Sequence, residues 1–256
     1  MSVQLSKRLR AVADFVPRGA RLADIGTDHA LLPAALLTEK RIAHAIAMDV
    51  GEGPLASALR TLREAGLDEN GAIELRRSDG FLALQKGEAD CAVIAGMGGE
   101  LMLRILKAAD VRTLQIHTLV LEPQSEVANV RRFLASSALA ITDEVMVEED
   151  DRFYPVLRVD TKADLDPYLL ACRALLEEGV TEKQVKRMLF RYGPVLMKKK
   201  DAVLREYLKK ECARMKAALR QIFEHDVKQD EHILALRQEY EDAVLAYALT
   251  GGTDAV

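Results

Sequence analysis

Strand-sized apolar runs alternate with helical segments up to about residue 160, and this alternation limits the possible folds more than any other feature. Strands are predicted where short apolar runs stand between turn signals, over residues 21–26, 43–49, 73–76, 90–94 and 118–122. Helices are predicted where apolar residues recur every three or four positions, over residues 5–16, 31–39, 54–65, 100–108 and 126–136. This alternation predicts an α/β fold with a doubly wound, mostly parallel sheet. Two later segments, 140–147 and 155–159, are expected to add an antiparallel pair at one edge.

No further strand is predicted after residue 164, where the sequence becomes helical almost to its end. We therefore expect two domains, an α/β domain over residues 1–163 and a smaller helical domain over residues 164–256. Leu204, Leu208, Glu211 and Met215 follow a helical spacing that continues in residues 233–247. Such a seam predicts an antiparallel helical hairpin that resembles a coiled coil. The hairpin can close within the chain or against a partner, so the oligomeric state stays open.

The apolar runs and the cysteines restrict the class of protein. The longest apolar runs are far shorter than the ~20 residues that cross a bilayer, so no membrane-spanning helix is expected. The first residues lack the apolar core of a signal peptide, and we expect a cytoplasmic protein. Cys91, Cys172 and Cys212 are widely spaced, which predicts reduced thiols instead of disulfides or a zinc site. No metal site is expected, and the motifs of serine hydrolases, P-loop nucleotidases and zinc proteases do not occur.

Charge is distributed unevenly along the chain. The net charge is −4, but residues 181–220 hold thirteen Lys and Arg against four Asp and Glu, a local balance of +9. We expect this segment to bind an anionic partner. The alternative is a solvated helical face that balances the acidic α/β domain.

A loop with two acidic residues follows the first predicted strand, at a point where doubly wound sheets bind ligands. The sequence there is Asp24-Ile-Gly-Thr-Asp-His-Ala. Gly26 reaches backbone conformations that other residues avoid and lets a cofactor approach the main chain. A dinucleotide site would need a second glycine where this loop has Asp28, whose carboxylate repels a pyrophosphate. S-adenosylmethionine instead carries a sulfonium and an ammonium group, which carboxylates attract. The loop therefore favours S-adenosylmethionine as the cofactor.

Three further strand ends carry residues that suit the same cofactor. Asp49 follows Gly26 by 23 residues, at the end of the second strand, where an acidic side chain typically binds both ribose hydroxyls of an adenosine. Asp79 and Gly80 follow the third strand, beside the expected adenine amine, and Gly96-Met97-Gly98 follows the fourth. Gly26 alone could be an ordinary turn, Asp79-Gly80 alone is more often a turn, and Asp28 or His29 alone is more often a helix cap. Their joint placement at four strand ends favours a cofactor site.

These motifs together resemble those of the bacterial tRNA (adenine-22-N1)-methyltransferases. The matching segments are Asp24-Ile-Gly-Thr-Asp-His-Ala-Leu-Leu-Pro, residues 49–54, Ser78-Asp-Gly and Ala95-Gly-Met-Gly-Gly, with Leu5-Ser-Lys-Arg-Leu and Arg152-Phe-Tyr-Pro flanking them. The resemblance spans nearly the whole chain. It implies a Rossmann-like class I methyltransferase domain, a C-terminal coiled-coil-like domain, and methyl transfer from S-adenosylmethionine to N1 of an adenine in the tRNA D-loop. It also implies that His29 joins Gly26, Asp49, Asp79 and residues 96–98 at the cofactor.

The implied tRNA substrate gives the basic residues a partner. Phosphate contacts are then expected from the basic segment of the second domain and from the N-terminal helix. The candidates are Lys186, Arg187, Arg191, Lys198, Lys199, Lys200 and Arg8.

Methyl transfer to adenine N1 makes modest chemical demands. The neutral ring has an in-plane lone pair at N1, so alignment and exclusion of water matter more than a strong base. The methylated ring is cationic near neutral pH, and a carboxylate that accepts a hydrogen bond from the N6 amine would stabilise the developing charge. Asp28 and Glu122 are the candidates because both are expected at strand ends.

Two departures from the family pattern keep alternatives open. Ala30-Leu31 stands where the family often has Gly-Tyr, and Leu121-Glu-Pro-Gln where it often has Leu-Gln-Pro-Asn. One alternative is a methyltransferase of the same fold that acts on another RNA, on DNA or on a small molecule. The other is a non-catalytic RNA-binding adaptor, for which the segment Glu122-Pro123-Gln124 is the only hint.

Overall fold

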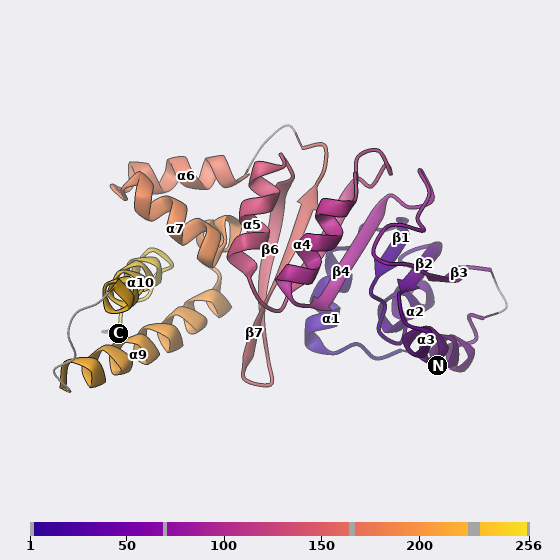
Figure 1. Ribbon diagram of the computed structural model, residues 1–256, viewed down its shortest axis with the longest axis horizontal. Helices are drawn as coiled ribbons and strands as arrows, with labels where there is room; N and C mark the ends of the chain where they lie inside the picture. Colours follow the sequence, from indigo (N-terminus) through magenta and orange to yellow (C-terminus); the bar gives the residue numbers. More distant parts are fainter. Residues whose placement is uncertain (1–2, 69–70, 164–166, 225–230, 255–256) are drawn as a thin grey trace. The chain divides into compact units, whose positions relative to one another are not determined.

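The computed structural model describes residues 3–68, 71–163, 167–224 and 231–254 of the chain. It divides into two compact units, Met1–Asp166 and Pro167–Val256 (Figure 1). The boundary expected between residues 163 and 164 adjoins residues 164–166, which lie outside the described residues.

The first unit is built on one seven-stranded sheet in the order β3-β2-β1-β4-β5-β7-β6. Its strands are β1 (Arg21–Ile25), β2 (His44–Asp49), β3 (Ile73–Arg77), β4 (Cys91–Met97), β5 (Thr118–Pro123), β6 (Ala140–Glu149) and β7 (Arg152–Asp160). The first five are parallel, whereas β7 pairs antiparallel with both β5 and β6. The predicted doubly wound sheet with an antiparallel pair at one edge is confirmed.

Helices cover both faces of this sheet (Figure 1). They are α1 (Lys7–Phe15), α2 (Leu31–Thr38), α3 (Glu52–Ala65), α4 (Gly99–Ala108) and α5 (Val127–Ser136). Helices α1, α2 and α3 share one hydrophobic core with the sheet, and α4 and α5 pack together on the other face. The central strands are buried on both faces, so Leu22, Ala45, Val93 and Val120 belong to continuous apolar runs instead of alternating ones.

Local capping residues fix the helix ends. Ser6 caps α1, and its hydroxyl accepts a hydrogen bond of 3.3 Å from the N–H of Leu9. Gly66, with a φ of 69°, ends α3 at the expected position. The start of α3 differs from the prediction, because the helix begins at Glu52 and its first turn accommodates Pro54.

Strand β4 extends three residues beyond the strand predicted over residues 90–94, and the extension shapes the site. The pairing register with β5 shifts between Ala95 and Met97, so Gly96 is the extra residue of a β-bulge. Its φ of 79° costs glycine little. The apolar pattern ends at Ile94, which is why the sequence alone predicts too short a strand.

The second unit is helical, and its helices are α6 (Pro167–Glu177), α7 (Glu182–Tyr192), α8 (Pro194–Lys199), α9 (Ala202–Glu224) and α10 (Glu231–Leu249). Helix α10 packs against both α9 and α7. The predicted seam is confirmed at Leu204, Leu208 and Met215, which are fully buried, but it is wrong at Glu211. Glu211 pairs with Arg214 on the flank of the helix, and Cys212 takes the buried position because a thiol is easier to desolvate than a carboxylate.

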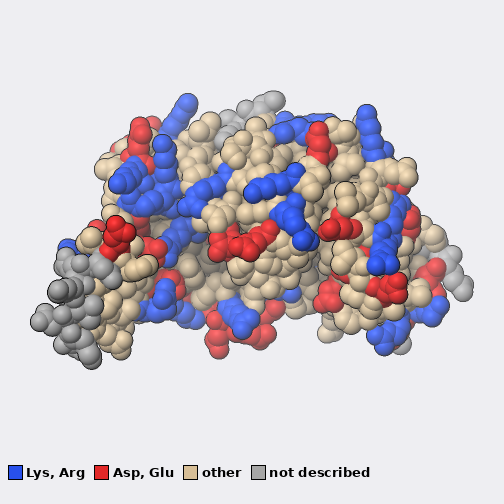
Figure 2. Space-filling model, viewed as in Figure 1, with Lys and Arg blue, Asp and Glu red and all other residues tan. Residues whose placement is uncertain are grey.

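Three surface and core features complete the fold. Lys and Arg side chains cover much of the displayed surface over α6 and α7 (Figure 2). Cys91 and Cys212 are buried, whereas Cys172 is half-buried. Within the described part of the chain, no helix has both the length and the apolar character needed to cross a lipid bilayer.

Candidate active site

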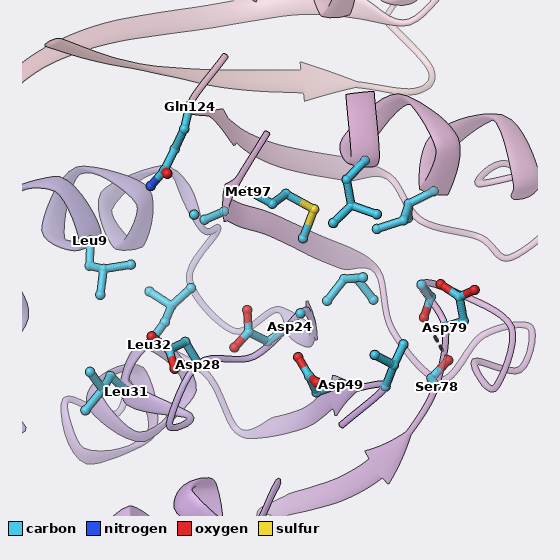
Figure 3. A pocket seen from close by; sticks show the side chains of 18 of the residues that line it. Leu9, Asp24, Asp28, Leu31, Leu32, Asp49, Ser78, Asp79, Met97 and Gln124 are labelled. Atoms are coloured by element: carbon cyan, nitrogen blue, oxygen red, sulfur yellow. Dashed lines mark hydrogen bonds between the residues drawn. The ribbon is translucent and has the colours of Figure 1, made fainter. Parts of the chain in front are cut away.

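A cavity of about 490 Å³ opens at the carboxyl ends of the parallel strands (Figure 3). Ser78 and Asp79 lie at one end of the cavity, Gln124 and Leu9 lie at the other, and Asp24 lies between them (Figure 3). The polar lining is dominated by four aspartates, Asp24, Asp28, Asp49 and Asp79. The apolar lining includes Leu9, Leu31, Leu32, Leu101 and Ile105. The cavity therefore lies where the strand-end motifs predict a cofactor.

Asp24 is the second-to-last residue of β1 and is nearly buried, with 7% of the residue exposed. Its Oδ2 accepts a hydrogen bond of 2.7 Å from the hydroxyl of Thr27. Burial raises the pKa of Asp24 to about 6; the Thr27 hydrogen bond lowers it, and the nearby carboxylates of Asp28 and Asp49 raise it. Ionisation of Asp24 therefore costs free energy at neutral pH, and a positive charge that comes close to it would offset this cost.

The loop after β1 is held in conformations that L residues rarely adopt. Gly26 has a φ of 73°, and a Cβ added there would lie 2.8 Å from Cε of Met97. His29 and Ala30 have φ values of 56° and 52°, in the left-handed region that costs a non-glycine residue about 1–2 kcal/mol. The loop thus brings its main chain close to the cavity and leaves no space for a side chain at position 26.

Asp28 and His29 lie at the rim of the cavity. The Asp28 side chain is 88% exposed and the His29 side chain 51% exposed, and His29 Nε2 lies 3.4 Å from Asp28 Oδ1. Asp28 lines the cavity, whereas His29 is not among the described residues that line it. The cofactor contact expected of His29 stays a prediction, and its observed neighbour is the Asp28 carboxylate.

Asp49 and Asp79 are presented by short turns. Asp49 Oδ1 accepts a hydrogen bond of 2.7 Å from the N–H of Gly51, which orients the carboxylate. The hydroxyl of Ser78 donates to the Gly80 carbonyl at 2.8 Å and closes the turn that carries Asp79 (Figure 3). A Cβ at Gly80 would lie 2.9 Å from Ile105, so this turn also needs a glycine.

Hydrogen bonds join the loop after β4 to the loop after β5. They run from the N–H of Gly96 to Glu122 (2.7 Å), from the N–H of Gln124 to the Met97 carbonyl (3.0 Å) and from the N–H of Gly99 to the Ser125 hydroxyl (3.2 Å). A Cβ at Gly99 would collide with the main chain of Ser125. The two loops thus form one wall, from which Met97 and Gln124 reach the cavity (Figure 3).

Glu122 differs from its predicted surroundings. It is fully buried and is not among the described residues that line the cavity. Its Oε2 lies 2.7 Å from Nη1 of Arg8. Burial raises the pKa of Glu122, while Arg8 and the N–H of Gly96 oppose the rise. Contact between Glu122 and a substrate stays a prediction, because the described structure encloses this carboxylate in the protein's own groups.

The basic residues of the candidate phosphate surface fall into two groups. Lys186, Lys198, Lys199 and Lys200 are exposed. Arg187 and Arg191 are half-buried and form ion pairs with Asp242 and Glu239 of α10. Phosphate contacts stay a prediction for all six, but for the two arginines the structure shows a role in holding α7 against α10. Arg8 differs from them because it lines the cavity of the first unit.

The sequence pointed to Gln124 only as part of a departure from the family pattern, and it did not indicate the apolar wall as part of the site. Gln124 follows β5 much as Asp79 follows β3, and this position was the available signal. Leu9, Leu31 and Leu32 follow ordinary helical spacing, so nothing local distinguishes them from core residues.

The cavity fits S-adenosylmethionine in charge and in shape. Carboxylates suit a ligand that carries a sulfonium and an ammonium group, and Asp49 at the end of β2 suits ribose hydroxyls. The glycines at positions 26 and 80 let their turns pack closely against Met97 and Ile105, which line the same cavity. Among the described residues, no group of three or more His, Cys, Asp or Glu is arranged to hold a metal ion.

Comparisons with known proteins agree with this assignment. A family model described as Methyltransferase domain matches residues 5–157. The chain is 37% identical over 211 residues to the tRNA (adenine(22)-N(1))-methyltransferase of Bacillus subtilis, over 81% of this chain and 80% of that protein. The crystal structure of the B. subtilis m1A22 tRNA methyltransferase TrmK matches with a TM-score of 0.72 at 32% identity, over 97% of this chain and 98% of that one. Streptococcus pneumoniae Sp1610 in complex with S-adenosyl-L-methionine matches with a TM-score of 0.77 at 29% identity, over 95% and 100% of the two chains.

The sheet order, the acidic cavity at the strand ends and the matching family model define a Rossmann-like, S-adenosylmethionine-dependent methyltransferase. The length and identity of the match to the B. subtilis enzyme narrow the class further. The chain belongs to the TrmK family of tRNA (adenine(22)-N(1))-methyltransferases.

Proposed function

We propose that the chain transfers the methyl group of S-adenosylmethionine to N1 of adenine 22 in the D-loop of tRNA. The observation that carries the proposal is the cavity lined by Asp24, Asp28, Asp49 and Asp79 at the strand ends of a chain 37% identical to a tRNA (adenine(22)-N(1))-methyltransferase. S-adenosylmethionine supplies an electrophilic methyl group. Because tRNA is the substrate, the proposed place of action is the cytoplasm.

The end of the cavity that holds Gln124 is the proposed site of the target adenine. The amide of Gln124 offers both a donor and an acceptor to the edge of a base. Leu9, Leu31 and Leu32 line the same end and exclude water from the reacting atoms (Figure 3). An adenine in a loop reaches such a cavity at a lower unstacking cost than an adenine in a duplex.

Asp28 is the proposed partner of the adenine N6 amine. Its exposed carboxylate lies at the rim of the cavity, on a loop in which the next two residues, His29 and Ala30, have left-handed backbone conformations. An anion beside N6 stabilises the positive charge that develops on the ring as N1 takes the methyl group. Asp28→Asn keeps the shape and removes the charge, so we expect single-turnover methylation to slow by about tenfold at saturating cofactor and tRNA. An unchanged rate would remove Asp28 from the mechanism.

The exposed lysines of the second unit are the proposed tRNA-binding surface. Lys198, Lys199 and Lys200 lie together where α8 ends, and Lys186 is exposed on α7. Contacts between such cations and phosphates are independent of base sequence, so they would bind the tRNA body and leave base selection to the cavity.

Transfer of labelled methyl from S-adenosylmethionine to an unmodified tRNA transcript tests the proposed function. We expect one labelled nucleotide, adenine 22, and no labelling of a transcript with guanine at that position. Label at another nucleotide would keep the methyltransferase and overturn the substrate assignment. Cofactor binding without transfer to any of a range of RNAs would indicate an adaptor.

A further inference from the structure

Helix α1 reaches the cavity through Arg8, whose side chain is only 19% exposed and whose main chain and side chain together contact three strands. Its Nη1 lies 2.7 Å from Oε2 of Glu122 on β5. Its main-chain N–H donates to Oε1 of Glu149 on β6 at 3.1 Å, and its guanidinium carbon lies 5.4 Å from the centre of the Tyr154 ring on β7. Arg8 is therefore a fixed part of the cavity wall and not a mobile surface cation.

Glu122 links Arg8 to the end of β4 and the loop that follows it. The oxygen that pairs with Arg8 also accepts the N–H of Gly96, at 2.7 Å. Gly96 is the bulged residue of β4, so the sheet ladder does not hold its N–H and the Glu122 carboxylate holds it instead. The next residue, Met97, points into the cavity and lies against Gly26 (Figure 3). A chain of contacts thus runs from Arg8 through Glu122 to the wall beside the cofactor loop.

The charges of this pair depend on each other. Glu122 is fully buried, and its Oε1 has no hydrogen-bond partner in the described structure. Two arginines line the neighbouring cavity: Arg104 lies 3.7 Å from Asp79, and Arg8 is the one that pairs with Glu122 and favours its ionised form. Loss of Arg8 would leave a buried charge uncompensated, whereas loss of both charges would not. A glutamine at position 122 could still accept the Gly96 hydrogen bond.

We propose that Arg8 and Glu122 act as one positioning unit that holds the bulge at Gly96 and so sets the wall formed by Met97 between cofactor and target base. The inference rests on the proposed methyl transfer. It assigns to Arg8 a role inside the active site in place of a phosphate contact. Neither residue of the pair exchanges a proton or bonds with the substrate in this role.

Three variants separate this role from the alternatives: Arg8→Met, Glu122→Gln and the double variant. We expect Arg8→Met to slow single-turnover methylation at saturating tRNA by at least about tenfold, as misplacement of reacting groups does. It should also weaken S-adenosylmethionine binding in calorimetry, a measurement that needs no turnover, and leave the tRNA dissociation constant within about twofold. In the double variant, the methylation rate and the S-adenosylmethionine affinity should both recover to within about threefold of their values in Glu122→Gln alone. The reason is that no uncompensated buried charge remains.

Arg10→Met is the matched control, since Arg10 lies on the same helix and forms an ion pair of 2.7 Å with Glu39 at the surface. It should leave cofactor affinity and rate unchanged. The proposal is overturned if Arg8→Met behaves like the wild type, if Glu122→Gln fails to rescue it, or if its only effect is weaker tRNA binding with a smaller salt dependence. Should Arg8→Met fail to fold, a double variant ten times slower than Glu122→Gln alone would overturn it equally, and equal rates would support it. Failure of the proposed function would show separately, as a wild type that does not methylate adenine 22.

Discussion

Replacing Asp24 with asparagine tests how the acidic cavity works, because it removes a charge and nearly preserves the shape. In the folded protein the pKa of Asp24 is about 6, whereas the ordinary value is 3.8. Between these two pH values the folded state binds more protons than the unfolded chain, so stability falls as the pH rises. Asp24 therefore costs nothing below about pH 4 and imposes its full penalty above about pH 6.

The size of the effect follows from the shift. About two pKa units correspond to ~3 kcal/mol. Asp24→Asn can add at most this amount to the free energy of unfolding of the ligand-free protein at pH 7.5, because a buried amide still needs partners. The Thr27 hydroxyl can donate to the new amide oxygen as it does to the carboxylate. At ~2–4 °C per kcal/mol, the midpoint of thermal unfolding should rise by up to ~6–12 °C.

Two measurements check the reasoning. Thermal unfolding by circular dichroism, without ligand, should show a gain at pH 7.5 that shrinks towards pH 4. Calorimetry at pH 7.5 should show S-adenosylmethionine bound at least about tenfold more weakly, since one charge pair is lost. S-adenosylhomocysteine lacks the sulfonium charge, so its affinity should fall less on the same substitution. A stability gain that is the same at both pH values, or undiminished S-adenosylmethionine affinity, would refute the proposed role of the charge.

Three further predictions concern other parts of the chain. Gly26→Ala forces a side chain into a φ of 73° and against Met97, so calorimetry should show S-adenosylmethionine binding weakened by about tenfold or more. Reversal of Lys198, Lys199 and Lys200 to glutamate should weaken tRNA binding and reduce the slope of log affinity against log salt, measured by filter binding at several salt concentrations, by about 2–3. Arg187→Met removes the ion-pair partner of Asp242, a carboxylate only 6% exposed, and thermal unfolding should show a loss of up to about 3 kcal/mol.

Each of these changes has a matched control. Gly53→Ala adds the same methyl group on α3, where nothing lies within 4 Å, and should not affect cofactor affinity. Reversal of the exposed Arg60, Lys86 and Lys107 in the first unit changes the net charge equally and should leave the salt slope unchanged. Arg237→Met breaks an exposed pair with Glu241 and should cost at most about 0.5 kcal/mol. Equal effects of a change and its control would contradict the corresponding prediction.

The elements of the fold are largely predictable from the sequence because the central strands are buried on both faces. Runs such as 45–48 and 119–121 are apolar without interruption, and the helices between them have clear periodicity and capping residues. The extension of β4 to Met97 is different. It depends on the bulge at Gly96 and on pairing with β5, neither of which leaves a local pattern.

Some residues of the candidate site can also be predicted from the sequence, and others cannot. Asp24, Asp49 and Asp79 follow from topology, because parallel strands bring their carboxyl ends to one edge. Partners distant in sequence do not follow: Arg8 lies 114 positions from Glu122, and only the folded structure shows that each neutralises the other. Arg187 likewise counts as a basic surface residue until α10 brings Asp242 to it.

The distribution of charge in the cavity also bears on release of the products. The four aspartates attract a cofactor with two positive groups, while the charge of Arg8, which also lines the cavity, is neutralised by Glu122 behind it. After methyl transfer the positive charge of the sulfonium has moved to the adenine ring, so Asp24 faces a cofactor product with one cation fewer. The cost of burying the Asp24 carboxylate, which raises its pKa, is then offset by one positive charge fewer. The affinity of the site for that product is therefore lower. Asp24→Asn should therefore lower the affinity for S-adenosylmethionine. It should also narrow the difference between the affinities for S-adenosylmethionine and for S-adenosylhomocysteine.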